Sequence, residues 1–314
     1  MGEQASKIGK KLENFGEVLF SGFGWTELAR DREITCKRSS HNKRTHGLDL
    51  VMKFDNPYTL TQQGIIIECK NRQMVSITQS NIEKWVKELI HSIECAQSSE
   101  ELSDLDLENT TMNTGLLLVH ANDYFDESKF QSCLKGISIP SRRNPINIFI
   151  AGNNEIDKWN ALVNHIRSNF TGRFEFVYPS INGSPKTSKY CLNINTLYSK
   201  YFFAQCTKIV PSFQYGVECN SAVREAVLFS FDEISKDNFK YMWSMFQYYQ
   251  FEDYDTYVFV FYPRKNEDVE FVKENFIKTI APSYGLHDKT LEEQIAHKIK
   301  LQFITNRQLS PIDN

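Results

Sequence analysis

The sequence predicts an α/β protein in which a mixed sheet is flanked by helices and a second α/β domain follows toward the C-terminus. Apolar residues recur at spacings of three and four over residues 6–25, which predicts a helix. Two short apolar runs, GLDLVMKF and GIIIECK, flank an Asn-Pro turn signal, which predicts a hairpin. The continuous apolar runs GLLLVHA and INIFIAG alternate with helical patterns, which is typical of buried strands in such a sheet.

Each further element of the first half has its own local signal. The helix at 6–25 ends at the glycines of SGFGW, and REITCK in the polar segment that follows fits a short edge strand. A helix over residues 78–97 begins after a capping residue, either Thr78 or Ser80. The remaining elements expected here are strands at 115–121 and 146–152 and helices at 126–134 and 154–170.

A cluster of proline, glycine and serine at residues 177–189 predicts a linker between a domain at 1–176 and an accessory α/β domain at 190–314. In the accessory domain strand-like and helical runs alternate again: REAVLFSF, DEISKDNFKYMWSMFQYYQF, TYVFVFYP and NEDVEFVKENFIKTIA. The aromatic-rich helix favours core packing or a subunit interface over base stacking, because few basic residues accompany its rings. We expect this domain to serve dimerisation or partner docking.

The composition narrows the class of protein. A net charge of -3 is near neutral, so a nucleic-acid partner needs a local basic patch. The seven cysteines include no C-x-x-C pair, which argues against a disulfide framework and a structural zinc site and favours a reducing cytoplasm. The seven histidines show no H-x-x-x-H spacing, so zinc chemistry is not expected. No apolar run approaches about 18 residues and no signal-peptide core is present, so neither export nor membrane insertion is expected.

Charged residues interrupt both arms of the expected hairpin, although buried unpaired charges are costly. Alternation along a strand puts Glu68 and Lys70 on one face, and Asp49 lies on the facing arm. The three groups therefore converge at one end of the sheet. Two carboxylates there suit a hard divalent cation, and the ammonium suits an attacking water.

Asp49 and the tripeptide Glu68-Cys69-Lys70 at the end of an apolar strand resemble the PD-(D/E)XK nuclease superfamily, of the kind found in Mrr-like restriction enzymes and phage-defence nucleases. This resemblance implies a restriction-endonuclease-like fold in residues 1–176. It also implies that Asp49 and Glu68 hold Mg²⁺, with Mn²⁺ as a substitute, that the Cys69 carbonyl completes the metal shell, and that Lys70 assists the nucleophile. Many members add a glutamate from the first helix, which fits Glu13, with Glu17 as the alternative.

The resemblance implies a magnesium-dependent endonuclease that hydrolyses DNA phosphodiester bonds in antiphage defence or restriction. Such nucleases work with a second protein subunit or as homo- or hetero-oligomers. One alternative is a catalytically silent nucleic-acid-binding or scaffold subunit. Another is an ordinary surface hairpin in which Glu68 and Lys70 form a solvated ion pair. A second E-x-K tripeptide, Glu127-Ser128-Lys129, lies in a polar stretch and indicates a surface helix start.

The segment CKRSSHNKRTHG precedes Asp49 and carries a basic patch: Lys37, Arg38, Lys43 and Arg44. A phosphate backbone bound there would be delivered to the expected cation. The alternative is a solvated loop, which is the commoner outcome for an isolated basic run.

Overall fold

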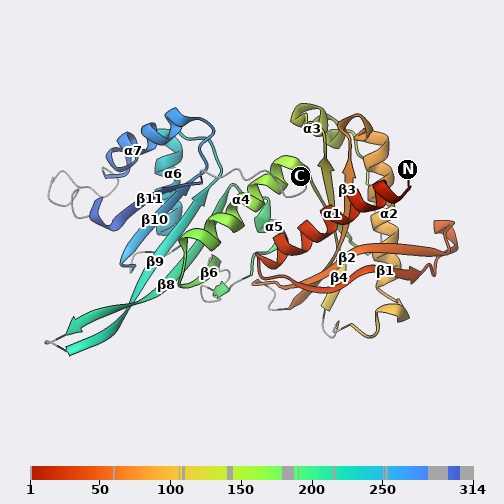
Figure 1. The fold of residues 1–314 in the computed structure, drawn as a ribbon, viewed down its shortest axis with the longest axis horizontal. Coiled ribbons are helices and arrows are strands. Elements are labelled where there is room, and N and C mark those ends of the chain that lie inside the picture. The colour runs from red at the N-terminus through yellow and green to blue at the C-terminus, as the bar shows by residue number, and fades with distance from the viewer. Residues whose placement is uncertain are drawn as a thin grey trace. The chain divides into compact units, whose positions relative to one another are not determined.

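The computed structural model describes residues 2–58, 61–105, 107, 110–139, 144–178, 187–189, 191–214, 217–249, 251, 254–281 and 296–304. The chain forms two compact units, Met1–Asn160 and Ala161–Arg307, and each is described by itself. Both are α/β units built on a mixed sheet, as the sequence predicts (Figure 1). In the described part of the chain, no helix has the length and apolarity needed to cross a bilayer.

The first unit contains a five-stranded sheet with the strand order β1-β2-β3-β4-β5. Strands β1, β2 and β3 pair antiparallel, whereas β3, β4 and β5 pair parallel. The predicted hairpin is confirmed as β2 and β3. The strands are β1 Thr26–Thr35, β2 Thr45–Asp55, β3 Gln62–Arg72, β4 Thr110–Ala121 and β5 Asn147–Ala151.

The predicted edge strand is confirmed as β1, which begins six residues earlier than REITCK. The helices are α1 Gly2–Ser21, α2 Gln79–Ala96, α3 Glu127–Lys135 and α4 Asn153–Asn169, with short 3-10 turns η1 Ser39–His41, η2 Met74–Ser76 and η3 Glu100–Leu102. Helix α4 crosses the division between the two units, which falls after Asn160. Thr78 caps α2 by accepting a hydrogen bond from the backbone N–H of Asn81.

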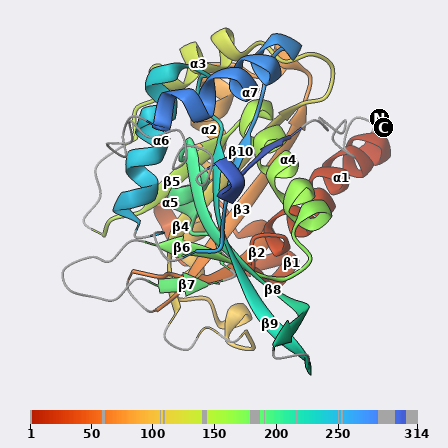
Figure 2. The ribbon, with the colours of Figure 1, turned by 90° about the vertical axis from the view of Figure 1, so that its left-hand side faces the viewer.

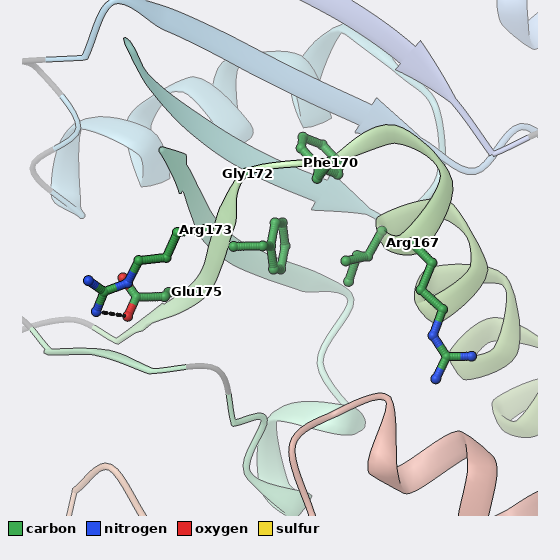
Figure 3. Close-up of a pocket in the computed structure, with 7 residues that line it drawn as sticks. Arg167, Phe170, Gly172, Arg173 and Glu175 are labelled. Atoms are coloured by element: carbon green, nitrogen blue, oxygen red, sulfur yellow. Dashed lines mark hydrogen bonds and ion pairs between the residues drawn. The ribbon is translucent and has the colours of Figure 1, made fainter. Parts of the chain in front are cut away.

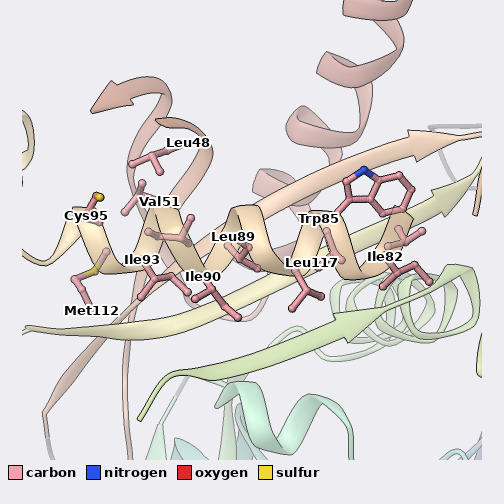
Figure 4. Close-up of a cluster of buried hydrophobic side chains, with 14 of the residues drawn as sticks. Leu48, Val51, Ile82, Trp85, Leu89, Ile90, Ile93, Cys95, Met112 and Leu117 are labelled. Carbon is pink, nitrogen blue, oxygen red and sulfur yellow. The ribbon is translucent and has the colours of Figure 1, made fainter. Parts of the chain in front are cut away.

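Helices α1 and α2 cover opposite faces of this sheet. Gly16 of α1 faces β4, because a Cβ there would lie 3.5 Å from a methyl group of Leu118. The neighbouring residue Leu117 points the other way and joins the core cluster under α2. Figure 4 shows that cluster, in which one stripe of α2 packs on the sheet with Ile82, Trp85, Leu89, Ile90 and Ile93. The periodicity that predicts the helix is therefore the stripe that it buries.

The second unit contains a six-stranded sheet with the order β11-β10-β9-β8-β6-β7. Its strands are β6 Arg173–Tyr178, β7 Thr187–Lys189, β8 Tyr201–Gln214, β9 Val217–Ser230, β10 Thr256–Phe261 and β11 Ile299–Phe303. Strands β8 and β9 form a long antiparallel hairpin (Figure 2). Two strands of this sheet, β6 and β7, fall where the sequence indicates the end of the first domain and the linker.

Aromatic side chains build the core of the second unit. Besides the short helix α5 Ile194–Leu197, it contains α6 Lys236–Tyr248 and α7 Asn266–Ile280. Phe239 of α6 and Phe276 of α7 meet Phe261 of β10 in one cluster. The aromatic run in α6 therefore packs into the core of the second unit. Core packing is one of the two roles that the sequence favours for it, and a subunit interface is the other. Two of its tyrosines, Tyr241 and Tyr248, are exposed.

A pocket of about 430 Å³ lies in the second unit, between the end of α4 and β6 (Figure 3). Its lining includes Phe170 and Phe174 and the two basic residues Arg167 and Arg173. Arg173 donates a 2.8 Å hydrogen bond to Glu175, so one of the two positive charges is already paired. This pocket shares no residue with the charged cluster on β2 and β3.

Candidate active site

Strands β2 and β3 bring Asp49 and Glu68 together. Leu50 pairs with Ile67, and Asp49 and Glu68 are the next residues along the two strands. Asp49 Oδ2 accepts a hydrogen bond of 2.7 Å from the backbone N–H of Cys69, the residue between Glu68 and Lys70. Glu68 is only 9% exposed. The cluster is therefore buried and connected, unlike a solvated surface hairpin.

Lys70 forms an ion pair with Glu68, and the side chains of both residues are largely buried. Burial by itself lowers the pKa of Lys70, but the charges of Glu68, Asp49 and Glu88 outweigh it and raise that pKa above its ordinary value. Lys70 therefore carries its proton at neutral pH. It can donate hydrogen bonds to a water or a phosphate oxygen, and it does not act as a base.

The two carboxylates repel one another in this setting. Burial raises the pKa of Asp49, although the N–H of Cys69 and the charge of Lys70 oppose the rise. Burial and the charge of Asp49 raise the pKa of Glu68. A divalent cation bound between such oxygens would relieve both the desolvation and the repulsion, and hard cations prefer oxygen ligands. The donor set therefore fits Mg²⁺ or Mn²⁺.

Glu13 of α1 is buried and interacts with Asp49. Burial first, and then the charges of Asp49 and Asp31, raise the pKa of Glu13 to about 7. The glycine at position 16 allows α1 to approach the sheet here, because a Cβ there would lie 3.3 Å from a methyl group of Leu50. Gly9 has no such role, since the nearest atom to a Cβ at that position is Oε1 of Glu13 itself, 3.8 Å away.

Glu17, the alternative helical carboxylate, points to other partners. It accepts a hydrogen bond of 3.2 Å from the hydroxyl of Ser21 and lies 3.5 Å from the guanidinium of Arg30. The structure therefore favours Glu13 as the helical carboxylate of the cluster.

Asp31 is a fourth carboxylate that the sequence does not single out. It lies on β1 between Arg30, which pairs with Leu50, and Arg32, which pairs with Leu48, so it is opposite Asp49. Its φ of 49° is in the left-handed region. It hydrogen-bonds Glu13 and lies 3.6 Å from the ammonium of Lys10. An aspartate between two arginines in a polar segment gives no sequence signal, because only strand pairing brings it to the site.

Cys69 contributes its backbone to the cluster. Burial raises the pKa of the Cys69 thiol well above its ordinary value, so the side chain stays protonated. The thiol is therefore not a nucleophile. That the backbone carbonyl of Cys69 is a metal ligand remains a prediction.

Three residues of the predicted basic patch already have acidic or carbonyl partners. Lys37 donates to the backbone oxygen of Ser98 at 2.7 Å and lies 3.1 Å from Glu100. The other two pairs are Arg38 with Glu94 at 3.2 Å and Lys43 with Glu88 at 3.3 Å. Arg44 is exposed. The patch thus presents less free positive charge than its sequence implies, and a phosphate would compete with these carboxylates.

The second E-x-K tripeptide lies elsewhere, at the start of α3. Glu127 accepts hydrogen bonds from the side-chain amides of Gln131 and Asn154, at 2.7 and 2.8 Å. Lys129 is exposed. The same three letters therefore occur in two different settings, and only Glu68 and Lys70 have a facing aspartate.

Comparison with known proteins agrees with this geometry. Residues 1–155 match the family model described as the GAPS4 protein PD-(D/E)XK nuclease domain. The match contains the whole sheet of the first unit and the four carboxylates of the cluster, Glu13, Asp31, Asp49 and Glu68. No curated protein matches the chain.

Proposed function

Residues 1–155 form a PD-(D/E)XK nuclease domain, and on this basis we propose that the protein is a divalent-metal-dependent endonuclease that hydrolyses DNA phosphodiester bonds in antiphage defence or restriction. The observation that carries the proposal is the hydrogen bond from the Cys69 N–H to Asp49, beside the buried pair of Glu68 and Lys70. This hydrogen bond and the ion pair hold two carboxylates and one ammonium near the same end of β2 and β3. A chain without chemistry at this site would have no reason to retain such charges in buried strands.

Asp49 and Glu68 would hold the cation, Mg²⁺ or Mn²⁺, with Glu13 and the Cys69 carbonyl completing its shell. When bound, the cation would supply a Lewis acid that lowers the pKa of a water and neutralises charge developing on the phosphate. Asp49 is held in place for this role because the N–H of Cys69 restricts its carboxylate. Glu13, with a pKa of about 7, would release its proton near neutral pH if a cation bound.

Lys70 acts on the phosphate and on the water. Its raised pKa keeps the ammonium charged, so it donates a hydrogen bond that orients the attacking oxygen and offsets the negative charge of the transition state. Lys70 pairs with one oxygen of Glu68, and because an ammonium carries three N–H groups, it would keep donors for the substrate if Glu68 held a cation. The attack is in line, and no covalent enzyme intermediate is needed.

The proposal includes a partner and a compartment. We propose that residues 190–314 dock a second protein subunit or a second copy of the chain. The exposed Tyr241 and Tyr248 of α6 supply aromatic surface suited to an interface. None of the six cysteines whose side chains are described forms a disulfide, which suits the cytoplasm.

A cleavage panel tests the proposal. Purified full-length protein is incubated with supercoiled plasmid, linear duplex DNA, single-stranded DNA and RNA, in Mg²⁺, in Mn²⁺ and in EDTA. Metal-dependent cutting of DNA that Asp49→Ala and Lys70→Ala abolish is the expected result. Cutting of RNA alone would reassign the substrate. Absence of both cleavage and calorimetric Mg²⁺ binding would favour the silent scaffold subunit.

A further inference from the structure

A second cluster of metal-ligating side chains lies where the β1–β2 connection meets the end of α2. Cys36 directly follows β1, His41 ends η1, His46 is the second residue of β2, and Cys95 is the penultimate residue of α2. One donor atom of each residue lies within 4.8 Å of the donor atoms of the other three. His41, His46 and Cys95 are buried, whereas Cys36 is partly exposed.

Four of the six donor–donor distances within this cluster match a tetrahedral metal shell. A tetrahedron with Zn–S of about 2.3 Å and Zn–N of about 2.05 Å separates two nitrogens by about 3.3 Å, nitrogen and sulfur by about 3.6 Å, and two sulfurs by about 3.8 Å. His41 Nδ1 lies 3.3 Å from His46 Nε2. The same Nδ1 lies 3.5 Å from Cys36 Sγ and 3.6 Å from Cys95 Sγ. The two sulfurs are 3.9 Å apart.

The surroundings of the cluster also suit a metal. The second ring nitrogen of His41, Nε2, lies 2.9 Å from Glu94 Oε2, and a carboxylate on the far nitrogen fixes the orientation of a metal-binding imidazole. Arg38 holds Glu94 in turn, at 3.2 Å. Burial raises the pKa of the Cys95 thiol above its ordinary value, and a hydrogen bond from the backbone N–H of Lys37 partly offsets that rise.

From this geometry we propose that Cys36, His41, His46 and Cys95 bind one zinc ion in a closed structural site. Two sulfurs and two imidazole nitrogens are a zinc donor set, whereas the carboxylate oxygens of Asp49 and Glu68 suit a hard cation. Four protein ligands leave no open position for water, so the site serves the fold and not catalysis. The inference is independent of the proposed nuclease activity.

A disulfide between Cys36 and Cys95 is the competing arrangement. The S–S bond is about 2.04 Å long, and the sulfurs here are 3.9 Å apart with His41 Nδ1 close to both. A disulfide would also leave His46 Nε2 and His41 Nδ1 facing each other without a common partner. The tetrahedral shell uses all four groups.

Zinc at this position would fasten the polar β1–β2 connection to the sheet. The connection has few apolar residues, and its basic side chains are exposed. Asp49 follows His46 by three residues on the same strand. The metal would therefore fix both the loop that carries Lys37, Arg38, Lys43 and Arg44 and the start of the strand that carries Asp49.

Metal analysis of the tag-free full-length protein, purified with reductant and without chelator, tests this proposal. We expect about one zinc per chain by mass spectrometry and about one in the matched control Cys133→Ser, whose cysteine lies on α3 outside the cluster. Cys36→Ser and Cys95→Ser should each retain less than about a tenth of that zinc. Wild-type protein that neither contains zinc nor binds added Zn²⁺ overturns the proposal, as does a Cys36–Cys95 disulfide under the same conditions.

A second measurement uses only wild-type protein, so that it does not depend on whether the variants fold. Cobalt added after zinc removal should give the visible absorption bands of a tetrahedral Co²⁺ site with thiolate ligands. Zinc re-addition should bleach these bands and restore the melting temperature to its value before chelation, and Mg²⁺ should do neither. Octahedral cobalt spectra, or a melting temperature that chelation leaves unchanged, would contradict the site. Zinc content and nuclease activity are measured separately, so failure of one does not imply failure of the other.

Discussion

The carboxylate of Asp49 accepts the backbone N–H of Cys69 at 2.7 Å, which locks the two arms of the β2–β3 hairpin at the residue between Glu68 and Lys70. This hydrogen bond connects Asp49 with the tripeptide Glu68-Cys69-Lys70, although the two are far apart in sequence. It also explains why an aspartate is tolerated in a buried run, because a hydrogen bond and the nearby ammonium of Lys70 compensate part of its desolvation.

Lys70 should be required as a charge and as a hydrogen-bond donor. We expect Lys70→Met to reduce the cleavage rate by about 10²-fold or more, because the variant removes a preorganised donor from the reacting phosphate. Lys70→Arg should retain part of the rate, since it keeps the charge with a different geometry. Single-turnover rates at saturating Mg²⁺ measure both. Equal rates for Lys70→Met and wild type would remove Lys70 from the mechanism.

In the metal-free protein, the stabilising contribution of Glu13 should decrease as the pH rises. The pKa of Glu13 is about 7 in the fold against an ordinary value of 4.5, so the folded state binds its proton more tightly than the unfolded state does. The stabilising contribution is full below about pH 4.5 and disappears as the pH rises through about 7. The raised pKa values of Asp49 and Glu68 act in the same direction.

Melting temperatures at pH 5 and pH 8, with and without Mg²⁺, measure this effect. Mg²⁺ should recover stability at pH 8, because it replaces the protons that the carboxylates release. In Glu13→Gln the difference between the melting temperatures at the two pH values should be smaller than in wild type. A difference that is the same in Glu13→Gln and in wild type would show that other groups cause it.

Asp31 should tune the proton affinity of Glu13. Its charge raises the pKa of Glu13, whereas the charge of Lys10 lowers it. Asp31→Asn should therefore shift the pH midpoint of Mg²⁺ binding to lower pH, and Lys10→Ala should shift it to higher pH. Calorimetric titrations with Mg²⁺ between pH 5.5 and 8.5 measure both shifts. Shifts of the same sign in the two variants would rule out an electrostatic origin.

Gly115 on β4 should be required by the packing of α2. A Cβ at this position would lie 2.8 Å from Cδ1 of Ile93 and 2.9 Å from Cδ2 of Leu89. Gly115→Ala should lower the free energy of unfolding by about 1–3 kcal/mol through overpacking. Leu89→Ala alone should cost about 2–5 kcal/mol because it leaves a cavity. In chemical denaturation the double variant should be destabilised by less than the sum of the two, and strict additivity would contradict the packing of Gly115 against Leu89.

The basic patch should bind the phosphate backbone without reading sequence. On a Glu68→Gln background, Lys43→Ala and Arg44→Ala should each weaken DNA binding. Each should also reduce the slope of log affinity against log salt by about 0.9 for every phosphate that the variant no longer neutralises. Lys129→Ala on α3 is the control, because it removes an exposed lysine away from the cluster. Unchanged salt slopes in Lys43→Ala and Arg44→Ala would make the segment a solvated loop.

The sequence allows the hairpin, the main helices of the first unit and the central charges to be predicted, because each depends on local periodicity. Asp49, Glu68 and Lys70 stand out as charges in apolar runs, and Thr78 stands out as a cap. Asp31 and Cys95 cannot be found in this way. They reach their clusters through strand pairing and through the position of the end of α2, and neither has a neighbour in sequence that marks it.

The second unit is less completely predictable from its sequence. Strand β8 does not stand out, because Lys208 and Pro211 interrupt its apolar pattern. The structure accommodates Lys208 through an ion pair of 2.6 Å with Glu225 of β9, which is 3% exposed and also pairs with Lys300 at 2.9 Å. Such cross-strand compensation is tertiary, so the local sequence pattern does not reveal it.

A comparison of the two E-x-K tripeptides of the same chain decides whether the nuclease site lies on β2 and β3. Mg²⁺-dependent cutting of supercoiled plasmid is measured for wild type, for Glu68→Gln with Lys70→Ala, and for Glu127→Gln with Lys129→Ala. We expect the first pair to abolish cutting and the second pair to leave it unchanged. Equal cutting by both variants, or absence of cutting only in the second, would contradict the assignment of the site to β2 and β3.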